Sequence, residues 1–155
     1  MQEIGRRITR DYAGREVVLV GVLKGAFIFM ADLARAIDLP VTCDFLRASS
    51  YRGTESSGEV RLEFDLTQSI QGKDVILVED IVDTGITAAA LLAQLKAKKA
   101  RSLALCSLMR KPSREKVAVP IDYLGFTIPD KFVVGYGLDF DGRYRNLPYL
   151  GVLRR

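Results

Sequence analysis

Three acidic side chains follow an apolar run in the segment VILVEDIVDTGIT, residues 75–87. They are Glu79, Asp80 and Asp83, and Thr84-Gly85-Ile86-Thr87 follows directly. Carboxylates suit the hydroxyl groups of a ribose, which donate hydrogen bonds, and they suit Mg²⁺, which prefers oxygen ligands. Backbone N–H groups at the start of a helix suit an anion such as phosphate. The segment therefore favours a ligand that carries both a ribose and a phosphate.

A plainer interpretation of the same segment is also open. Asp83-Thr84 would cap the N-terminus of a helix, and Glu79-Asp80 would form a solvated turn. This explains three neighbouring acids poorly, because a helix cap requires a single polar side chain. A Walker phosphate loop is excluded, since the GxxxxGK[ST] spacing is absent from the sequence.

The composition limits the chemistry that the chain can perform. Its 155 residues, 48% of them hydrophobic, fit one globular domain with a true core. There is no His, so any acid–base chemistry must use Asp, Glu, Lys, Tyr or Cys. The net charge of +4 is small, and no run of like charges indicates a tail that binds nucleic acid.

The sequence also bears on location. No segment approaches the ~18 consecutive apolar residues of a membrane span, and the N-terminal MQEIGRRITRDY lacks the apolar region of a secretory signal. Cys43 and Cys106 lie far apart in apolar surroundings, which predicts two reduced core residues. We therefore expect a cytoplasmic protein without membrane contact.

Hydrophobic periodicity predicts alternating strands and helices that position the acidic segment. Predicted helices span residues 2–13, 25–37 and 86–98, and predicted strands span 16–23, 41–51, 60–64, 75–79, 102–109, 122–126 and 132–135. Alternation of this kind indicates an α/β fold with a parallel sheet flanked by helices. We expect a single domain, with a core of about residues 1–120 and a small C-terminal hood of about residues 121–155.

Four segments, in order, resemble the type I phosphoribosyltransferase family. VILVEDIVDTGIT resembles the family's binding motif for phosphoribosyl diphosphate (PRPP), in the form of its hypoxanthine-guanine branch. VGVLKGAFIFMADL (20–33) resembles the diphosphate-binding loop, and SSYRGTESSGEV (49–60) resembles the flexible loop that closes over PRPP. DYLGFTIPDKFVVGYGLDFDGRYRNLPYLGVL (122–153) resembles the purine-binding hood. The resemblance covers nearly the whole chain.

The resemblance implies purine salvage. The family transfers the 5-phosphoribosyl group from PRPP to N9 of a purine, with Mg²⁺ as cofactor and diphosphate as the second product. Hypoxanthine and guanine, giving IMP and GMP, are the bases implied by this branch. The family's enzymes assemble as homodimers or homotetramers, so we expect a homo-oligomer that binds no nucleic acid.

The resemblance also assigns roles around the acidic segment. Glu79 and Asp80 match the residues that hold the ribose hydroxyls and Mg²⁺, and Asp83 matches the catalytic residue that faces N7 of the purine. The loop that binds the 5′-phosphate matches Asp83, Thr84, Gly85, Ile86 and Thr87.

Further roles fall on other segments. Lys24, Gly25 and Arg145 match contacts to diphosphate, and Ser50 and Tyr51 match the flexible loop. The purine subsite matches Lys111, Lys131, Phe132, Val133 and Asp139. Within that set, Lys111 would donate to O6, Phe132 would stack on the base, and Asp139 would bind a second Mg²⁺. Arg110 stands where an acid is common in the branch, so Arg110 competes with Lys111 for the role at O6.

Two rival functions stay open at this point. Some proteins of the same fold bind RNA or DNA as regulators without catalysis, and the net charge of +4 permits this. The other rival is a related enzyme that uses xanthine or a pyrimidine, although DKFVVGYGLD argues against the pyrimidine. The sequence does not rank hypoxanthine, guanine and xanthine.

Overall fold

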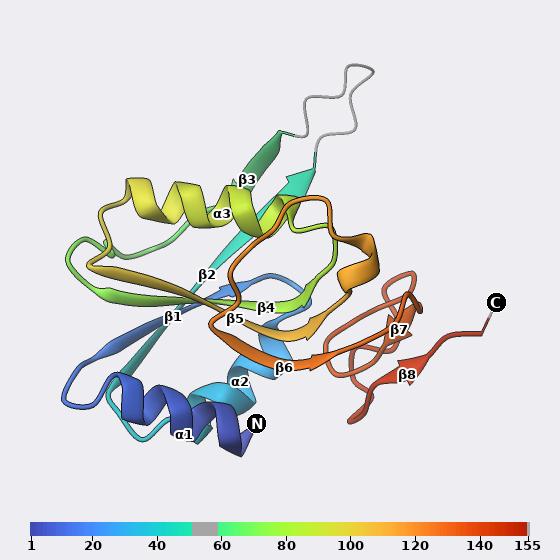
Figure 1. Cartoon of the computed structure of the whole chain (residues 1–155), viewed down its shortest axis with the longest axis horizontal. Helices are drawn as coiled ribbons and strands as arrows, with labels where there is room; N and C mark the ends of the chain where they lie inside the picture. Colours follow the sequence, from blue (N-terminus) through green and yellow to red (C-terminus); the bar gives the residue numbers. More distant parts are fainter. Residues whose placement is uncertain (51–58, 155) are drawn as a thin grey trace.

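The computed structural model describes residues 1–50 and 59–154, which form a six-stranded sheet, a smaller two-stranded sheet and the helices around them (Figure 1). The helices are α1 (Gln2–Asp11), α2 (Phe27–Ala36), α3 (Ile86–Ala97) and the 3₁₀ helix η1 (Pro112–Arg114). The strands are β1 (Val17–Val22), β2 (Val41–Ser50), β3 (Val60–Phe64), β4 (Asp74–Val82), β5 (Ser102–Arg110), β6 (Tyr123–Thr127), β7 (Val133–Val134) and β8 (Gly151–Val152). The larger sheet has the order β3-β2-β1-β4-β5-β6, and only β3 runs antiparallel to its neighbour.

Each face of the larger sheet carries its own hydrophobic core. Helices α1 and α2 cover one face, where Ile8, Phe29 and Leu33 are fully buried (Figure 1). Helix α3 covers the other face with the buried side chains of Leu91 and Leu95. Each such side chain contributes about 1.5–3 kcal/mol on burial. The sheet is therefore held from both sides, which explains why its central strands read as continuous apolar runs.

The strand order creates a crevice at one edge of the sheet. The chain leaves β1 through α2 toward β2 on one side, and it leaves β4 through α3 toward β5 on the other side. Because β1 and β4 are neighbours, the two connections diverge at their carboxyl ends. Open α/β sheets bind ligands at such a point, where the strand order reverses.

The C-terminal segment of residues 121–155, predicted above to form a hood, is attached to the rest of the chain by strand pairing and by side chains. Its first strand, β6, joins the larger sheet, whereas β7 and β8 pair with each other. Leu138 is buried in the core shared with α1 and α2, and the hydroxyl of Tyr136 donates to Asp32 of α2. The hood is thereby held beside the carboxyl ends of the strands.

The predicted strands and helices are present within the described residues, but some of their ends differ, and β8 was not predicted. Strand β4 does not end at residue 79 but continues to Val82, because β5 offers backbone partners along its full length. The second helix begins at Phe27 rather than at residue 25. The prediction of a buried Cys43 was wrong: Cys106 is buried, but Cys43 is exposed on β2. Across the described ranges, no helix has both the length and the apolar character needed to cross a membrane.

A buried carboxylate ties the amino ends of β4 and β5 together. Asp74 is 1% exposed, and it accepts hydrogen bonds from the guanidinium of Arg101 and, at 2.6 Å, from the hydroxyl of Ser102. Arg101 is the main cause that lowers the pKa of Asp74 from 3.8 to about 2. The ionised carboxylate therefore favours the folded state by about 2 kcal/mol near neutral pH.

We predict that this stabilisation disappears in acid. As the pH falls, the unfolded chain takes up the proton first, since its pKa is the higher one, and the folded state loses stability. The difference in free energy of unfolding between wild type and Asp74→Asn should shrink by about 1 kcal/mol from about pH 6 to about pH 3. Urea unfolding of both proteins measures it, with Asp38→Asn as an exposed control. Parallel pH profiles for wild type and Asp74→Asn would contradict the prediction.

Candidate active site

Two adjoining cavities lie at the carboxyl ends of β1, β4 and β5, and both are lined by Ile81 and Asp83. The larger cavity has a volume of about 360 Å³ and is lined by Val22, Leu23, Gly25, Asp80, Ile81, Asp83, Lys111, Phe132, Val133, Leu138, Asp139 and Arg145. The smaller cavity has a volume of about 210 Å³ and is lined by Glu79, Ile81, Val82, Asp83, Thr84, Gly85, Thr87 and Ala88. Most of the residues that the sequence analysis selected therefore gather in one place.

The end of β4 has a free edge that faces the cavities. Strand β4 pairs with β1 only as far as Val78, opposite Gly21, but it pairs with β5 as far as Val82. Successive side chains of a strand point to opposite faces of the sheet. Glu79 accordingly lines the smaller cavity and Asp80 the larger one. The two acids, which were expected to act together, border different cavities.

Both acids resist ionisation in the free protein. Glu79 is 6% exposed, and burial raises the pKa of its carboxyl well above the ordinary value of 4.5, with a further rise from the charge of Asp80. Burial also raises the pKa of Asp80, although the backbone N–H of Ile81, which donates to Asp80 at 2.8 Å, opposes the rise. A ligand that supplies positive charge or hydroxyl donors would stabilise the ionised form of both carboxyl groups.

The loop after β1 approaches the acids through its backbone. A Cβ atom added to Gly25 would overlap Oδ2 of Asp80, so a larger residue there would displace this carboxylate. Gly25 lines the larger cavity, whereas the side chain of Lys24 is exposed and does not line it. The peptide bond between Leu23 and Lys24 is cis. The loop therefore presents its backbone to the larger cavity at Gly25, and the contact of Lys24 with diphosphate stays a prediction.

The start of α3 closes the smaller cavity. Gly85 is the N-cap residue of α3, with a φ angle of 83°, and a Cβ atom there would overlap the carbonyl oxygen of Val117. Gly85 has no side chain to cap this helix, but the hydroxyl of Thr84 accepts a hydrogen bond from the backbone N–H of Ile86 at 3.4 Å. The predicted cap is therefore formed in part, by Thr84, whereas Glu79 is buried on β4 and does not lie in a solvated turn. The first N–H groups of a helix have no intrahelical acceptor. Apart from that of Ile86, they are open to an anion, beside the hydroxyls of Thr84 and Thr87 that line the same cavity.

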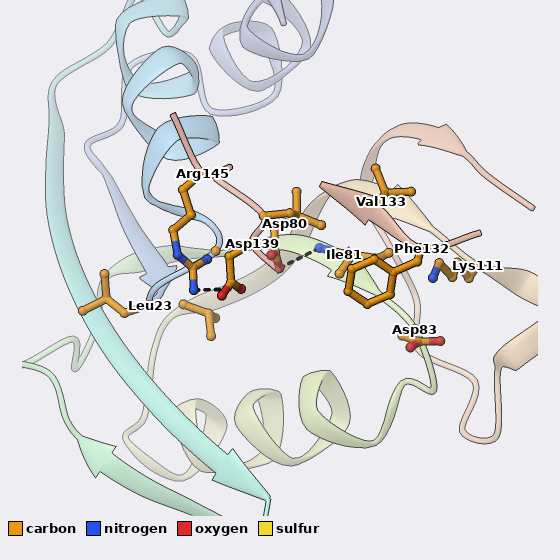
Figure 2. Close-up of a pocket in the computed structure, with 12 residues that line it drawn as sticks. Leu23, Asp80, Ile81, Asp83, Lys111, Phe132, Val133, Asp139 and Arg145 are labelled. Atoms are coloured by element: carbon orange, nitrogen blue, oxygen red, sulfur yellow. Dashed lines mark hydrogen bonds and ion pairs between the residues drawn. The ribbon is translucent and has the colours of Figure 1, made fainter. Parts of the chain in front are cut away.

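Lys111 and the aromatic ring of Phe132 border the other end of the larger cavity (Figure 2). Lys111 is 8% exposed, and its backbone N–H donates to the carbonyl of Val82 at 3.0 Å. Arg110 instead forms an ion pair with Glu115 at 2.5 Å. Of the two cations that the sequence left in competition, only Lys111 lines the cavity.

Asp139 and Arg145 form an ion pair on the opposite side of the larger cavity from Lys111 (Figure 2). Arg145 Nη2 lies 3.0 Å from Asp139 Oδ1, and Arg145 Nη1 donates to the carbonyl of Gly137 at 2.6 Å. The charge of Asp139 contributes to the raised pKa of Asp80, and the charge of Arg145 opposes it. One acid and one cation of the hood therefore act electrostatically on the end of β4.

Some predicted residues are not brought to the cavities. Lys131 is exposed, and neither Lys131 nor Ile86 lines either cavity. Ser50 is the last residue of β2, and Tyr51 lies outside the described residues. Phe132 is 40% exposed and packs edge-on against Phe140, with 5.7 Å between ring centroids.

Sequence reasoning missed Ile81, Arg114 and Asp130. Ile81 follows Asp80 and was given no role, although it lines both cavities. Arg114 forms an ion pair with Asp83 at 2.7 Å, and Asp130 lies 3.9 Å from Lys111. No local sequence pattern marks Arg114 or Asp130, since each lies far in sequence from the residue that it pairs with. The sequence around Asp130 was assigned only to the predicted hood, without a role for Asp130 itself.

Comparison with known proteins identifies the fold. Residues 2–141 match the phosphoribosyl transferase domain family. A crystal structure of a hypoxanthine phosphoribosyltransferase from Staphylococcus aureus superposes with a TM-score of 0.94, at 47% identity, over 99% of this chain and 84% of that one. The arrangement of a mostly parallel sheet with flanking helices is thus the type I phosphoribosyltransferase fold.

Two relatives have different lengths. The bifunctional protein TilS/HprT of Listeria innocua is 50% identical over 155 residues, which are 99% of this chain but 24% of that protein, so the chain spans about a quarter of this relative. The hypoxanthine phosphoribosyltransferase of Salmonella typhimurium is 50% identical over 152 residues, covering 96% of this chain and 85% of that protein. Because the family model matches residues 2–141 and the Salmonella typhimurium relative is matched over 85% of its length, the chain belongs to the phosphoribosyltransferase family, within its hypoxanthine(-guanine) branch.

Proposed function

We propose that the protein transfers the 5-phosphoribosyl group from PRPP to N9 of hypoxanthine or guanine, which yields IMP or GMP and diphosphate. The observation that carries this proposal is the pair of adjoining cavities that share Asp83 and Ile81. One cavity offers helix N–H groups and hydroxyls for a phosphate, and the other offers Lys111 and Phe132 for a base. A single nucleotide would span both, with its ribose beside β4.

The roles of the residues follow from this placement. The start of α3, with Thr84 and Thr87, would hold the 5′-phosphate. Gly25 and Arg145 would contact the diphosphate, and Glu79 and Asp80 would accept hydrogen bonds from the ribose hydroxyls. Placing the base and the ribose in one cavity turns an encounter in solution into a positioned reaction, which lowers the entropic part of the barrier.

Charge is the second contribution of the site. In the proposed reaction, C1 of the ribose becomes positively charged as diphosphate leaves, so nearby carboxylates favour the transition state. Asp80 borders the cavity where this carbon would lie, and Asp83 borders the base. We assign Asp83 to N7 of the purine, where its carboxylate would accept a proton or stabilise positive charge on the ring.

We propose Mg²⁺ as the cofactor. Mg²⁺ is usually held by one or two carboxylates together with substrate phosphates and water. Asp80 and Asp139 line the same cavity and suit that role, and Glu79 approaches from the smaller cavity. Bound with PRPP, the ion would neutralise charge on the diphosphate. No group of three or more His, Cys or acidic side chains gathers as a metal site within residues 1–50 and 59–154.

We further propose a cytoplasmic homodimer or homotetramer whose single domain carries the hood over the core. A solved structure of the hypoxanthine phosphoribosyl transferase from Trypanosoma cruzi, 40% identical to this chain, carries a description that concerns the role of the C-terminal region in oligomeric state and enzymatic activity. In the present chain the C-terminal hood contributes Phe132, Asp139 and Arg145 to the larger cavity. Assembly and catalysis would then depend on the same segment.

The test of the function is release of diphosphate from PRPP with hypoxanthine, guanine or xanthine in the presence of Mg²⁺. Wild type should turn over at least one of these 6-oxopurines. Asp83→Asn keeps the shape of the side chain but removes its charge, and it should lower kcat about a hundredfold or more while the affinity for PRPP stays close to wild type.

Two outcomes of this assay would contradict the proposal. Failure of wild type to release diphosphate with any 6-oxopurine would refute the activity, and salt-sensitive binding of RNA by the same sample would favour a regulator instead. Unchanged kcat in Asp83→Asn would refute only the role of this residue.

Lys111 is predicted to select the base. A lysine can donate hydrogen bonds but cannot accept them, so it suits the 6-oxo group of hypoxanthine better than the 6-amino group of adenine. A hydrogen bond to a charged group contributes about 1.5–3 kcal/mol, so Lys111→Ala should raise KM for the purine about tenfold or more. KM for PRPP should change little in steady-state kinetics. The control is Lys116→Ala, which removes an exposed lysine; equal purine affinity in both variants would count against the assignment.

Glu79 is predicted to lower the stability of the free protein at neutral pH and to strengthen ligand binding. Its pKa is higher in the folded than in the unfolded state, so between these two values stability falls as the pH rises. Glu79→Gln should therefore unfold with a higher free energy than wild type at about pH 7, and the gain should vanish near pH 4. The same variant should bind PRPP with Mg²⁺ more weakly. Urea unfolding without ligands and titration with PRPP measure the two effects, and a loss of stability at neutral pH would contradict this prediction.

A further inference from the structure

The segment 110–117 is fixed to the loop that carries Asp83. The backbone N–H of Lys111 donates to the carbonyl of Val82 at 3.0 Å, and those of Lys116 and Val117 donate to the carbonyl of Thr84 at 2.9 and 3.0 Å. The Gly85 backbone lies directly against Val117. Side chains on this segment therefore keep a constant position relative to the two cavities.

Within that segment, Arg114 holds one oxygen of the Asp83 carboxylate. Arg114 Nε donates to Asp83 Oδ1 at 2.7 Å, and among the described residues no other side chain forms a hydrogen bond or ion pair with Asp83. The second oxygen, Oδ2, has no such partner within the same residues. A carboxylate anchored by one oxygen can present the other one to a base in a defined direction.

Arg114 also connects Asp83 with the far end of the base cavity. Arg114 Nη1 lies 3.9 Å from Asp130 Oδ2, and Lys111 Nζ lies 3.9 Å from Asp130 Oδ1. Charges alternate along Asp83, Arg114, Asp130 and Lys111. The groups that we assign to N7 and O6 of the purine are thus joined by two intermediate side chains.

Stability does not explain the Asp83–Arg114 pair. The two side chains are 39% and 47% exposed, and exposed ion pairs contribute only about 0–1 kcal/mol. The guanidinium is planar and fixes a carboxylate in direction as well as in position, which a lysine ammonium does not. The geometry therefore points to orientation of Asp83 as the effect of Arg114.

We propose that Arg114 is a positioning residue that orients the carboxylate of Asp83 toward the purine before the base binds. The proposal rests on the function proposed above. It adds that part of the rate depends on a side chain that touches neither substrate, and that loss of Arg114 acts on kcat through Asp83.

A double-mutant cycle tests the proposal. The variants are Arg114→Gln, Asp83→Ala and the combination, each assayed for kcat and for KM of purine and PRPP. Arg114→Gln should lower kcat about tenfold in the wild-type background, which is typical coupling for residues in contact, and by less than about twofold in the Asp83→Ala background. KM for PRPP should stay unchanged. Arg114→Lys keeps the charge and should restore part of the kcat.

The matched control is Arg110→Gln, which breaks the pair with Glu115 on the same segment and should leave kcat within about twofold of wild type in both backgrounds. Equal losses from Arg114→Gln in the two backgrounds, no loss in the wild-type background, or the same loss from Arg110→Gln would each overturn the proposal. If Arg114→Gln unfolds at a much lower urea concentration than wild type, the double-mutant cycle is repeated with Arg114→Lys in place of Arg114→Gln. A wild type without turnover would overturn the function and the positioning role together, whereas an additive cycle in an active enzyme overturns the latter alone.

Discussion

Strand β4 extends past its neighbour β1, and the site depends on this difference in length. Pairing with β1 ends at Val78, whereas pairing with β5 continues to Val82. The backbone of residues 79–82 therefore pairs with β5 along one edge and has no strand partner along the edge that faces β1. Because side chains alternate along the strand, this short stretch delivers an acid to each of two cavities. A β1 that was four residues longer would fill the space in which we place the ribose.

Burial of two adjacent carboxyl groups at the open edge of β4 is electrostatically unfavourable in the free protein. Glu79 and Asp80 are adjacent, burial raises the pKa of both, and the charge of Asp80 adds to the rise at Glu79. Arg145 opposes the raised pKa of Asp80 only in part, because its ion-pair partner Asp139 adds to the rise. Sites that keep unfavourable groups usually recover the energy when a ligand binds. Ribose hydroxyls and Mg²⁺ would supply the missing donors and positive charge.

The sequence predicts the sheet well, because buried strands and helices leave simple apolar patterns. It predicts the types of the site residues for the same reason: acids, a glycine and a lysine stand directly after such runs. It does not predict where β4 ends, since the partner strand decides this, and it therefore grouped Glu79 with Asp80. Arg114 ends the short, exposed 3₁₀ helix η1, where an arginine is normally solvated. Only the folded chain brings it to Asp83, 31 positions away.

Contacts of the main chain, in addition to side-chain contacts, assemble the site from distant segments. Gly25 fits against Asp80 only because it lacks a Cβ atom, and Gly85 fits against Val117 for the same reason. Lys111 is fixed to β4 by its N–H group. These contacts fix the main chain of the site segments relative to one another. A substitution that adds bulk at Gly25 would therefore move Asp80 itself, and it would disturb the ribose and diphosphate regions together rather than either one alone.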